Sequence, residues 1–163
     1  MTDISSNKVA IVTGGSRGVG AATAKLLASR GWNVTITCTS SIDEANKIVS
    51  ECEDLGVEAL ALTANVAEDE SCRFTAQETI KKWGRIDALV NNAGTTKFVF
   101  NHSDLDGLDA EDFLHIYKVN VVGPFQMVRA CREMLLESNN PSCLLYTSPS
   151  PRDATLSRMP SSA

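Results

Sequence analysis

The chain has 163 residues, of which 43% are hydrophobic and 21% charged; this is enough for one compact domain with its own core and too little for two. Fifteen Lys and Arg against twenty Asp and Glu give a net charge of −5, and the basic residues form no run, which argues against binding to nucleic acid or to an anionic membrane. No apolar stretch is long enough to span a membrane, and residues 1–8 (MTDISSNK) lack the basic start and apolar core of a signal peptide. We therefore expect a cytoplasmic protein.

The cysteines and histidines give no sign of a metal centre. The five cysteines are odd in number, dispersed, and never spaced as Cys-x-x-Cys, which disfavours both a disulfide framework and a zinc site. His102 and His115 have no neighbouring ligand cluster. We predict reduced thiols and no bound metal.

Strand-like and helix-like segments alternate along residues 1–142. Short apolar runs predict strands at 8–13, 33–38, 57–63 and 86–90, and helical periodicity predicts helices at 18–30, 42–55, 68–83 and 109–137, with a polar loop at 95–108. Ser41 and Glu44 have the spacing of a capping box at the start of the second helix, and Gly31, Gly56 and Gly84 follow the first three helices.

Two of these helices carry apolar residues at helical spacing. In the first helix they are Val19, Ala22, Leu26 and Leu27, and in the second they are Ala45, Ile48, Val49, Cys52 and Leu55. The strands are continuously apolar rather than alternating, which is typical of a parallel sheet covered on both faces. The fold class predicted is therefore α/β, a doubly wound parallel sheet with a Rossmann-like strand order.

A glycine-rich segment lies directly between the first strand and the first helix. Residues 13–20 read TGGSRGVG, and in that position backbone amides and the positive end of a helix can hold a pyrophosphate. Gly14, Gly18 and Gly20 would allow a tight turn, close approach of the ligand and close packing of the helix. This motif predicts a dinucleotide site.

The spacing Gly-x-x-x-Gly-x-Gly differs from the general dinucleotide fingerprint and resembles that of the short-chain dehydrogenase/reductase family. Three further landmarks follow in the family's order: Asn65-Val66, the NNAG segment at 91–94, and KVNVVG at 118–123. The resemblance implies that Asn65-Val66 lies beside the adenine, that NNAG supports the sheet and touches the cofactor, and that Asn120 is the catalytic-site Asn. Among family members, the 3-oxoacyl-acyl-carrier-protein reductases are the most similar, in the residues after the second strand (39–48, TSSIDEANKI) and in the general character of the sequence.

From the motif and the resemblance together we predict one set of cofactor-binding residues. They are Thr13, Gly14, Ser16, Arg17, Gly18, Val19, Gly20, Thr39, Ser40, Asn65, Val66, Asn92, Ala93 and Gly94.

The residues after the second strand indicate which dinucleotide is bound. An NAD-selective site places an acid there to accept from the ribose 2′-hydroxyl, whereas a 2′-phosphate requires that acid to be absent and a cation to be near. Cys38, Thr39, Ser40 and Ser41 fill this stretch, and Arg17 in the glycine loop supplies a cation. We therefore predict NADP(H) in preference to NAD(H).

Part of the family's catalytic set is missing from the chain. The resemblance implies a Tyr-x-x-x-Lys pair beside a Ser, but residue 121 after Tyr117 is Val and residue 150 after Tyr146 is Ser. Asn120 remains. Pro124 has no N–H to donate to the Asn120 carbonyl, so we expect a kink that frees this oxygen for the water-binding relay that the resemblance implies.

Residues 143–163 (CLLYTSPSPRDATLSRMPSSA) differ in composition from the rest and hold three of the five prolines. CLLYTSPSPRD back-translates into a transposase-type sequencing adaptor, and SRMPSSA resembles the end of its primer. We therefore predict that residues 1–142 form an NAD(P)-binding Rossmann domain, the amino-terminal part of a longer enzyme, and that residues 143–163 are a non-native or disordered tail. Ser148, about where the family's catalytic Ser belongs, is expected to carry no chemistry.

The resulting functional hypothesis is an NADP(H)-dependent oxidoreductase that transfers hydride between nicotinamide and a carbonyl or secondary alcohol, including an acyl-carrier-bound one. This chain, as a fragment, is expected not to turn over. Two alternatives stay open: a non-catalytic dinucleotide-binding protein, and an NAD-linked sugar or steroid dehydrogenase of the same fold. The resemblance also implies that the full-length form is a homo-oligomer.

Overall fold

The computed structural model describes residues 7–101 and 103–146 and contains one five-stranded sheet. The strands are β1 (Val9–Val12), β2 (Asn33–Cys38), β3 (Ala59–Thr63), β4 (Ala88–Asn91) and β5 (Ser142–Leu145). All pairings are parallel, and the strand order is β3-β2-β1-β4-β5. The predicted doubly wound fold class is confirmed.

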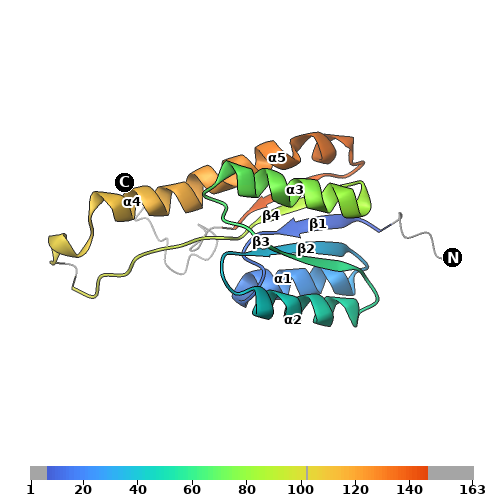
Figure 1. Cartoon of the computed structure of the whole chain (residues 1–163), viewed down its shortest axis with the longest axis horizontal. Helices are drawn as coiled ribbons and strands as arrows, with labels where there is room; N and C mark the ends of the chain where they lie inside the picture. The colour runs from blue at the N-terminus through green and yellow to red at the C-terminus, as the bar shows by residue number, and fades with distance from the viewer. Residues whose placement is uncertain (1–6, 102, 147–163) are drawn as a thin grey trace, which may run out of the picture.

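The helices cover both faces of the sheet, as Figure 1 shows. They are α1 (Gly18–Ser29), α2 (Ile42–Glu53), α3 (Asp69–Trp83), α4 (Ala110–Tyr117) and α5 (Gly123–Glu137). Helices α1 and α2 lie on one face and α3 and α5 on the other, while α4 extends beyond the sheet (Figure 1). The predicted polar loop contains a short 3-10 turn at Leu105–Gly107.

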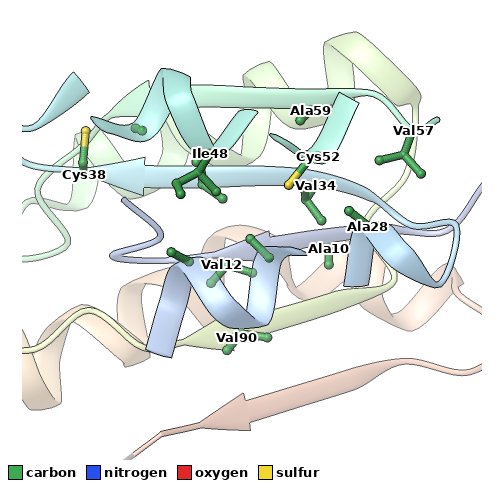
Figure 2. Packing of buried hydrophobic residues seen from close by; sticks show 14 of the residues in the cluster. Ala10, Val12, Ala28, Val34, Cys38, Ile48, Cys52, Val57, Ala59 and Val90 are labelled. Atoms are coloured by element: carbon green, nitrogen blue, oxygen red, sulfur yellow. The ribbon is translucent and has the colours of Figure 1, made fainter. Parts of the chain in front are cut away.

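Alternate residues of β1 supply two separate cores. Ala10 and Val12 pack with Val34 and Ile36 under α1 and α2 (Figure 2), whereas Ile11 packs on the opposite face under α3 and α5. All five side chains are fully buried. Burying each of the Val and Ile side chains contributes about 1.5–3 kcal/mol, so the continuous apolar strands hold the sheet between its two helix layers.

Helix α1 uses a different face from the one its large apolar residues suggest. Its buried residues are Gly20, Ala21, Ala24 and Ala28, whereas Val19 and Leu26 are about half exposed, at 48% and 56%. The expected apolar face is therefore wrong, apart from Leu27, which packs against the core. Small residues let the helix axis approach the sheet closely, and this closeness brings the start of α1 onto the glycine loop.

Two expectations for α2 also fail. Ser41 is the N-cap residue, but its side chain makes no capping hydrogen bond, so the predicted capping box with Glu44 does not form. Leu55 lies beyond the end of the helix and is 49% exposed. Ala45, Ile48 and Cys52 are buried as expected.

The long predicted helix is interrupted at the expected place. A π-helical turn spans Lys118–Val122 between α4 and α5, and the N–H of Gly123 donates to the carbonyl of Lys118. Because Pro124 cannot donate to the carbonyl of Asn120, the regular α-helical pattern cannot continue there. Asn120 therefore lies in the widened turn.

All five cysteines are free thiols. Burial raises the pKa of Cys72 to about 11 and that of Cys131 to about 12, so both remain protonated and unreactive. In the described part of the chain, no group of side chains has the composition of a metal site. No described helix is long and apolar enough to cross a membrane.

Candidate functional site

A cleft of about 650 Å³ opens at the carboxyl ends of the strands. Its walls come from the segments that follow β1, β2, β3 and β4, together with one turn of α4 and the end of β5. This is the edge at which parallel α/β sheets bind ligands, at the point where the strand order reverses between β1 and β4. The lining residues are Gly14, Ser16, Arg17, Val19, Gly20, Thr37, Cys38, Thr39, Ser40, Ser41, Ala64, Asn65, Val66, Asn92, Ala93, Gly94, Thr95, His115, Val119 and Tyr146.

All of the predicted cofactor-binding residues except Thr13 and Gly18 line this cleft. Thr13 is buried beneath it, at 1% exposure. Gly18 lies at the start of α1 with a φ of +57°. Asn120 does not line the cleft. Its side chain accepts a hydrogen bond from the N–H of Thr95, which does line the cleft.

Two glycines of the loop are required for different geometric reasons. Gly14 has a φ of +66°, a conformation that favours glycine over residues with a side chain. A Cβ at Gly20 would lie 2.3 Å from the Gly14 carbonyl oxygen and 2.5 Å from Nδ2 of Asn92. The start of α1 therefore contacts the glycine loop with no room for a methyl group.

Gly15, which the motif did not single out, is required as well. A Cβ there would lie 2.6 Å from the Cβ of Ile36, and the Gly15 N–H donates to the Thr37 carbonyl at 2.9 Å. The loop after β1 thus packs directly against β2. The need for glycine at position 15 becomes visible only from this contact between segments that are far apart in the sequence.

The amino terminus of α1 is free to receive an anion. The N-cap residue Arg17 is extended and its side chain makes no capping hydrogen bond, and the first turn holds no acidic residue. The first N–H groups of a helix and its positive dipole end favour a negative charge. Phosphate is the natural partner for such a terminus beside a glycine loop.

Thr13 and Asn92 join the glycine loop to the end of β4. Thr13 Oγ1 accepts from the backbone N–H groups of Asn92 and Ala93, both at 3.0 Å. Asn92 Nδ2 donates back to the carbonyls of Thr13 at 2.8 Å and Gly14 at 3.1 Å. These four bonds fix the floor of the cleft across the strand-order reversal.

The wall after β2 is polar and lacks acids. Thr39, Ser40 and Ser41 line it next to Cys38, whose pKa is raised by burial. Among the described residues that line the cleft, Arg17 carries the one permanent charge, and none is Asp or Glu. The cleft is therefore suited to a negatively charged ligand.

Asn65 shapes the wall after β3. Its Oδ1 accepts from the Ala67 N–H at 3.1 Å, and its Nδ2 donates to Glu68 Oε1 at 3.0 Å. Both groups of the side chain are thus engaged in the turn that leads into α3. This turn presents Val66 to the cleft.

Asn120 is bound to the loop after β4 through both the oxygen and the nitrogen of its side-chain amide. Its Oδ1 accepts from the Thr95 N–H at 2.9 Å, and its Nδ2 donates to the Thr95 carbonyl at 2.8 Å. Gly94 lies beside it, where a Cβ would be in ordinary contact with Asn120 Oδ1 at 3.4 Å. The π-turn therefore positions the loop through a side chain.

Several lining residues were missed by the sequence analysis. Thr37, Ser41, Ala64 and Thr95 each directly adjoin a predicted site residue or strand end, so strand topology could have found them. His115 lies on α4, Val119 in the π-turn and Tyr146 just after β5, and it is the placement of these elements against the sheet that brings the three residues to the cleft. The Tyr146 N–H donates to the Asn91 carbonyl at 2.9 Å, so this residue extends the pairing of β5 with β4. Ser148 lies outside the described residues.

Comparison with known proteins identifies the same architecture. The short chain dehydrogenase family model matches residues 8–150. The 3-oxoacyl-acyl-carrier-protein reductase FabG of Staphylococcus epidermidis is 33% identical over 142 residues, which cover 87% of this chain and 57% of that protein. The chain thus spans a little over half the length of this relative.

Solved structures agree. A short-chain dehydrogenase/reductase from Burkholderia xenovorans is 40% identical with a TM-score of 0.78, over 82% of this chain and 55% of that one. An alcohol dehydrogenase from Thermococcus sibiricus complexed with 5-hydroxy-NADP is 30% identical with a TM-score of 0.75, over 83% and 56%. An NAD+-bound xylitol dehydrogenase is 27% identical with a TM-score of 0.74, over 83% and 51%. With its parallel sheet, its glycine loop and a family match over most of its length, the chain belongs to the short-chain dehydrogenase family.

Proposed function

We propose that this chain is the dinucleotide-binding part of an NADP(H)-dependent oxidoreductase acting on a carbonyl or a secondary alcohol. The observation that carries the proposal is the uncapped start of α1, which meets a glycine loop in a cleft where Arg17 is the one permanent charge among the described lining residues. In this proposal residues 1–142 make up the binding domain, to whose sheet the structure adds β5 and to whose cleft it adds Tyr146. The bound nicotinamide would supply the hydride.

The residues of the chain divide the binding work along the cleft. Backbone N–H groups at the start of α1 would face the pyrophosphate, Gly14 would provide the tight turn, and Gly20 would let α1 begin directly against the glycine loop. The β2 and β3 walls serve the adenosine half, and Asn92, Gly94 and Thr95 serve the nicotinamide half, because a dinucleotide spans the strand-order reversal. Asn120 holds Thr95 in place for that half.

The preference for NADP(H) gives the first test. Arg17→Ala should weaken NADPH binding by about 1.5–3 kcal/mol, the range for hydrogen bonds to charged groups, and leave NADH binding nearly unchanged. Fluorescence titration with each cofactor measures this. Arg30→Ala is the matched control, since Arg30 is exposed at the other end of α1 and should alter neither affinity. Equal losses for both cofactors in Arg17→Ala would contradict a role in binding the 2′-phosphate.

The substrate class follows from the relatives and remains part of the proposal. The similarity to a 3-oxoacyl-acyl-carrier-protein reductase favours a small carbonyl substrate, including an acyl-carrier-bound one. The similarity to an NAD+-bound xylitol dehydrogenase keeps an NAD-linked sugar dehydrogenase as the second candidate. The ratio of NADPH to NADH affinity separates the two.

The 163-residue chain itself should not turn over. Neither of its tyrosines is followed by Lys at the fourth position, and a positioned general acid typically contributes about 10²–10⁴ in rate. The test is to confirm folding by circular dichroism and to follow NADPH absorbance with acetoacetyl-type and simple ketone substrates. Enzyme-like turnover would mean that another proton donor suffices.

A second copy of the chain is the partner we propose. Phe113, Tyr117, Val121 and Phe125 recur at every fourth residue along α4, the π-turn and α5, and all four are exposed. Such an apolar stripe is typical of a helix interface, and a two-fold axis lets one stripe cover its own copy. We expect sedimentation velocity to detect a dimer that Phe125→Glu dissociates. A parent chain that is monomeric at all concentrations would contradict this.

A further inference from the structure

The wall after β3 is held by a residue that lies far from it in the sequence. Gln126, in the first turn of α5, is 8% exposed and its Nε2 donates to the Val66 carbonyl at 2.8 Å. Val66 is itself 5% exposed and lines the cleft. A buried side-chain amide thus donates a hydrogen bond to the backbone of one wall of the proposed binding site.

The same contact requires a close approach of α5. A Cβ at Gly123 would lie 2.9 Å from Cγ2 and 3.1 Å from the carbonyl oxygen of Val66. Among the described residues, the second side-chain donor to this carbonyl is the Cys72 thiol, at 3.4 Å, and thiols are weak donors. Gln126 is therefore the main side-chain restraint on the position of the Val66 carbonyl.

The π-turn and α5 follow each other without a break, and together they contact the wall after β3 and the wall after β4. Six residues before Gln126, Asn120 grips Thr95 in the loop after β4. Gln126 grips Val66 in the loop after β3. The spacing between the β3 wall and the β4 wall is thus fixed by the π-turn and the start of α5.

We propose that Gln126 is a positioning residue for the adenosine half of the dinucleotide, acting through the Val66 carbonyl. The inference rests on the proposed function of the cleft. A ligand that spans the strand-order reversal places its adenosine against the β2 and β3 walls, so an unrestrained Val66 segment would affect that half. The nicotinamide half contacts residues that Asn120 still holds.

The test uses the full 163-residue chain and its Gln126→Met variant, which keeps the side-chain volume and removes the donor. The probes are adenosine 2′,5′-bisphosphate for one half and nicotinamide mononucleotide for the other, titrated by NMR chemical shifts, with NADPH for the whole. Losing one buried hydrogen bond should weaken the bisphosphate and NADPH about three- to tenfold and leave the mononucleotide unchanged. Gln126→Leu, which also lacks the donor and carries no charge, should behave in the same way.

Gln77→Met is the matched control, because Gln77 is exposed on the neighbouring helix α3 and should change no affinity. Unchanged bisphosphate binding in both Gln126 variants would overturn the inference, as would equal losses for both halves, which would indicate a general structural role. If the parent chain binds none of the three probes, the proposed function itself fails. If it binds them and the Gln126 variants bind equally well, only the positioning role fails.

Discussion

Replacing Gly20 with Val should abolish measurable dinucleotide binding. The first added atom would lie 2.3 Å from the Gly14 carbonyl oxygen and 2.5 Å from Asn92 Nδ2, and neither neighbour can yield cheaply. Asn92 Nδ2 already donates to the Thr13 and Gly14 carbonyls, so moving it breaks the link between the glycine loop and β4. Fluorescence titration of this variant should show no saturation at NADPH concentrations tenfold above the Kd of the parent, which corresponds to a loss of about 1.4 kcal/mol or more.

The control for this substitution is Ala22→Val, two residues further along α1. Ala22 is exposed, so the larger side chain meets solvent there and costs only the lower helix propensity of Val, at most about 0.7 kcal/mol. Its affinity for NADPH should match that of the parent. Parent-like binding by a folded Gly20→Val chain would show that the glycine loop is not the phosphate site.

Replacing Asp87 with Ala should lower the free energy of unfolding more than any other substitution proposed for this chain. Asp87 is 1% exposed, and its carboxylate accepts from Nε and Nη2 of Arg85, each at 2.8 Å. It also accepts from the Val9 N–H at 2.8 Å and Ser138 Oγ at 2.7 Å. The substitution leaves a buried backbone donor without an acceptor and should cost about 2–4 kcal/mol, measured by urea unfolding.

The stabilisation by Asp87 should depend on pH. Burial raises the pKa of this carboxyl, but the hydrogen bonds from Arg85, Ser138 and Val9 outweigh it and hold the pKa below its ordinary value of 3.8. A lowered pKa in the folded state means that the contribution is fully present above the unfolded value and is lost as the pH falls through the folded one. The stability difference between parent and variant should therefore be constant at neutral pH and shrink below about pH 4.

Asp69 is the control for Asp87. It also accepts from two arginines, Arg73 and Arg129, but on the surface of the protein. Water screens and replaces such contacts, so Asp69→Ala should change the unfolding free energy far less. Similar losses in the two variants would mean that the Asp87 network contributes no more than an exposed ion pair.

The fold could be predicted because its signals are local. Strands β1 to β4 are short apolar runs at the predicted positions, and Gly84 ends α3 in the left-handed conformation that its position suggested, with a φ of +72°. Strand β5 (Ser142–Leu145) was not among the predicted strands, because all but its first residue lie in the segment assigned to the tail; in the structure it pairs with β4. The residues flanking the carboxyl ends of β1 through β4 converge on one cleft for the topological reason that parallel strands all end at the same edge. Strand order and site location thus followed from the pattern.

The errors arose where packing across elements decides the outcome. The burial of Ala21, Ala24 and Ala28 instead of Leu26 depends on how closely α1 approaches the sheet, which side-chain size alone does not reveal. The need for glycine at position 15 depends on Ile36. The bond from Gln126 to Val66 joins residues 60 positions apart, beyond any spacing rule.

The most direct test of dinucleotide binding is to titrate the folded 163-residue chain with NADPH by isothermal titration calorimetry, and to repeat the titration with NADH. One molecule per chain should bind saturably, more tightly for NADPH than for NADH, and the Gly20→Val variant should bind neither. A chain that is folded by circular dichroism and binds neither cofactor would contradict the proposed function.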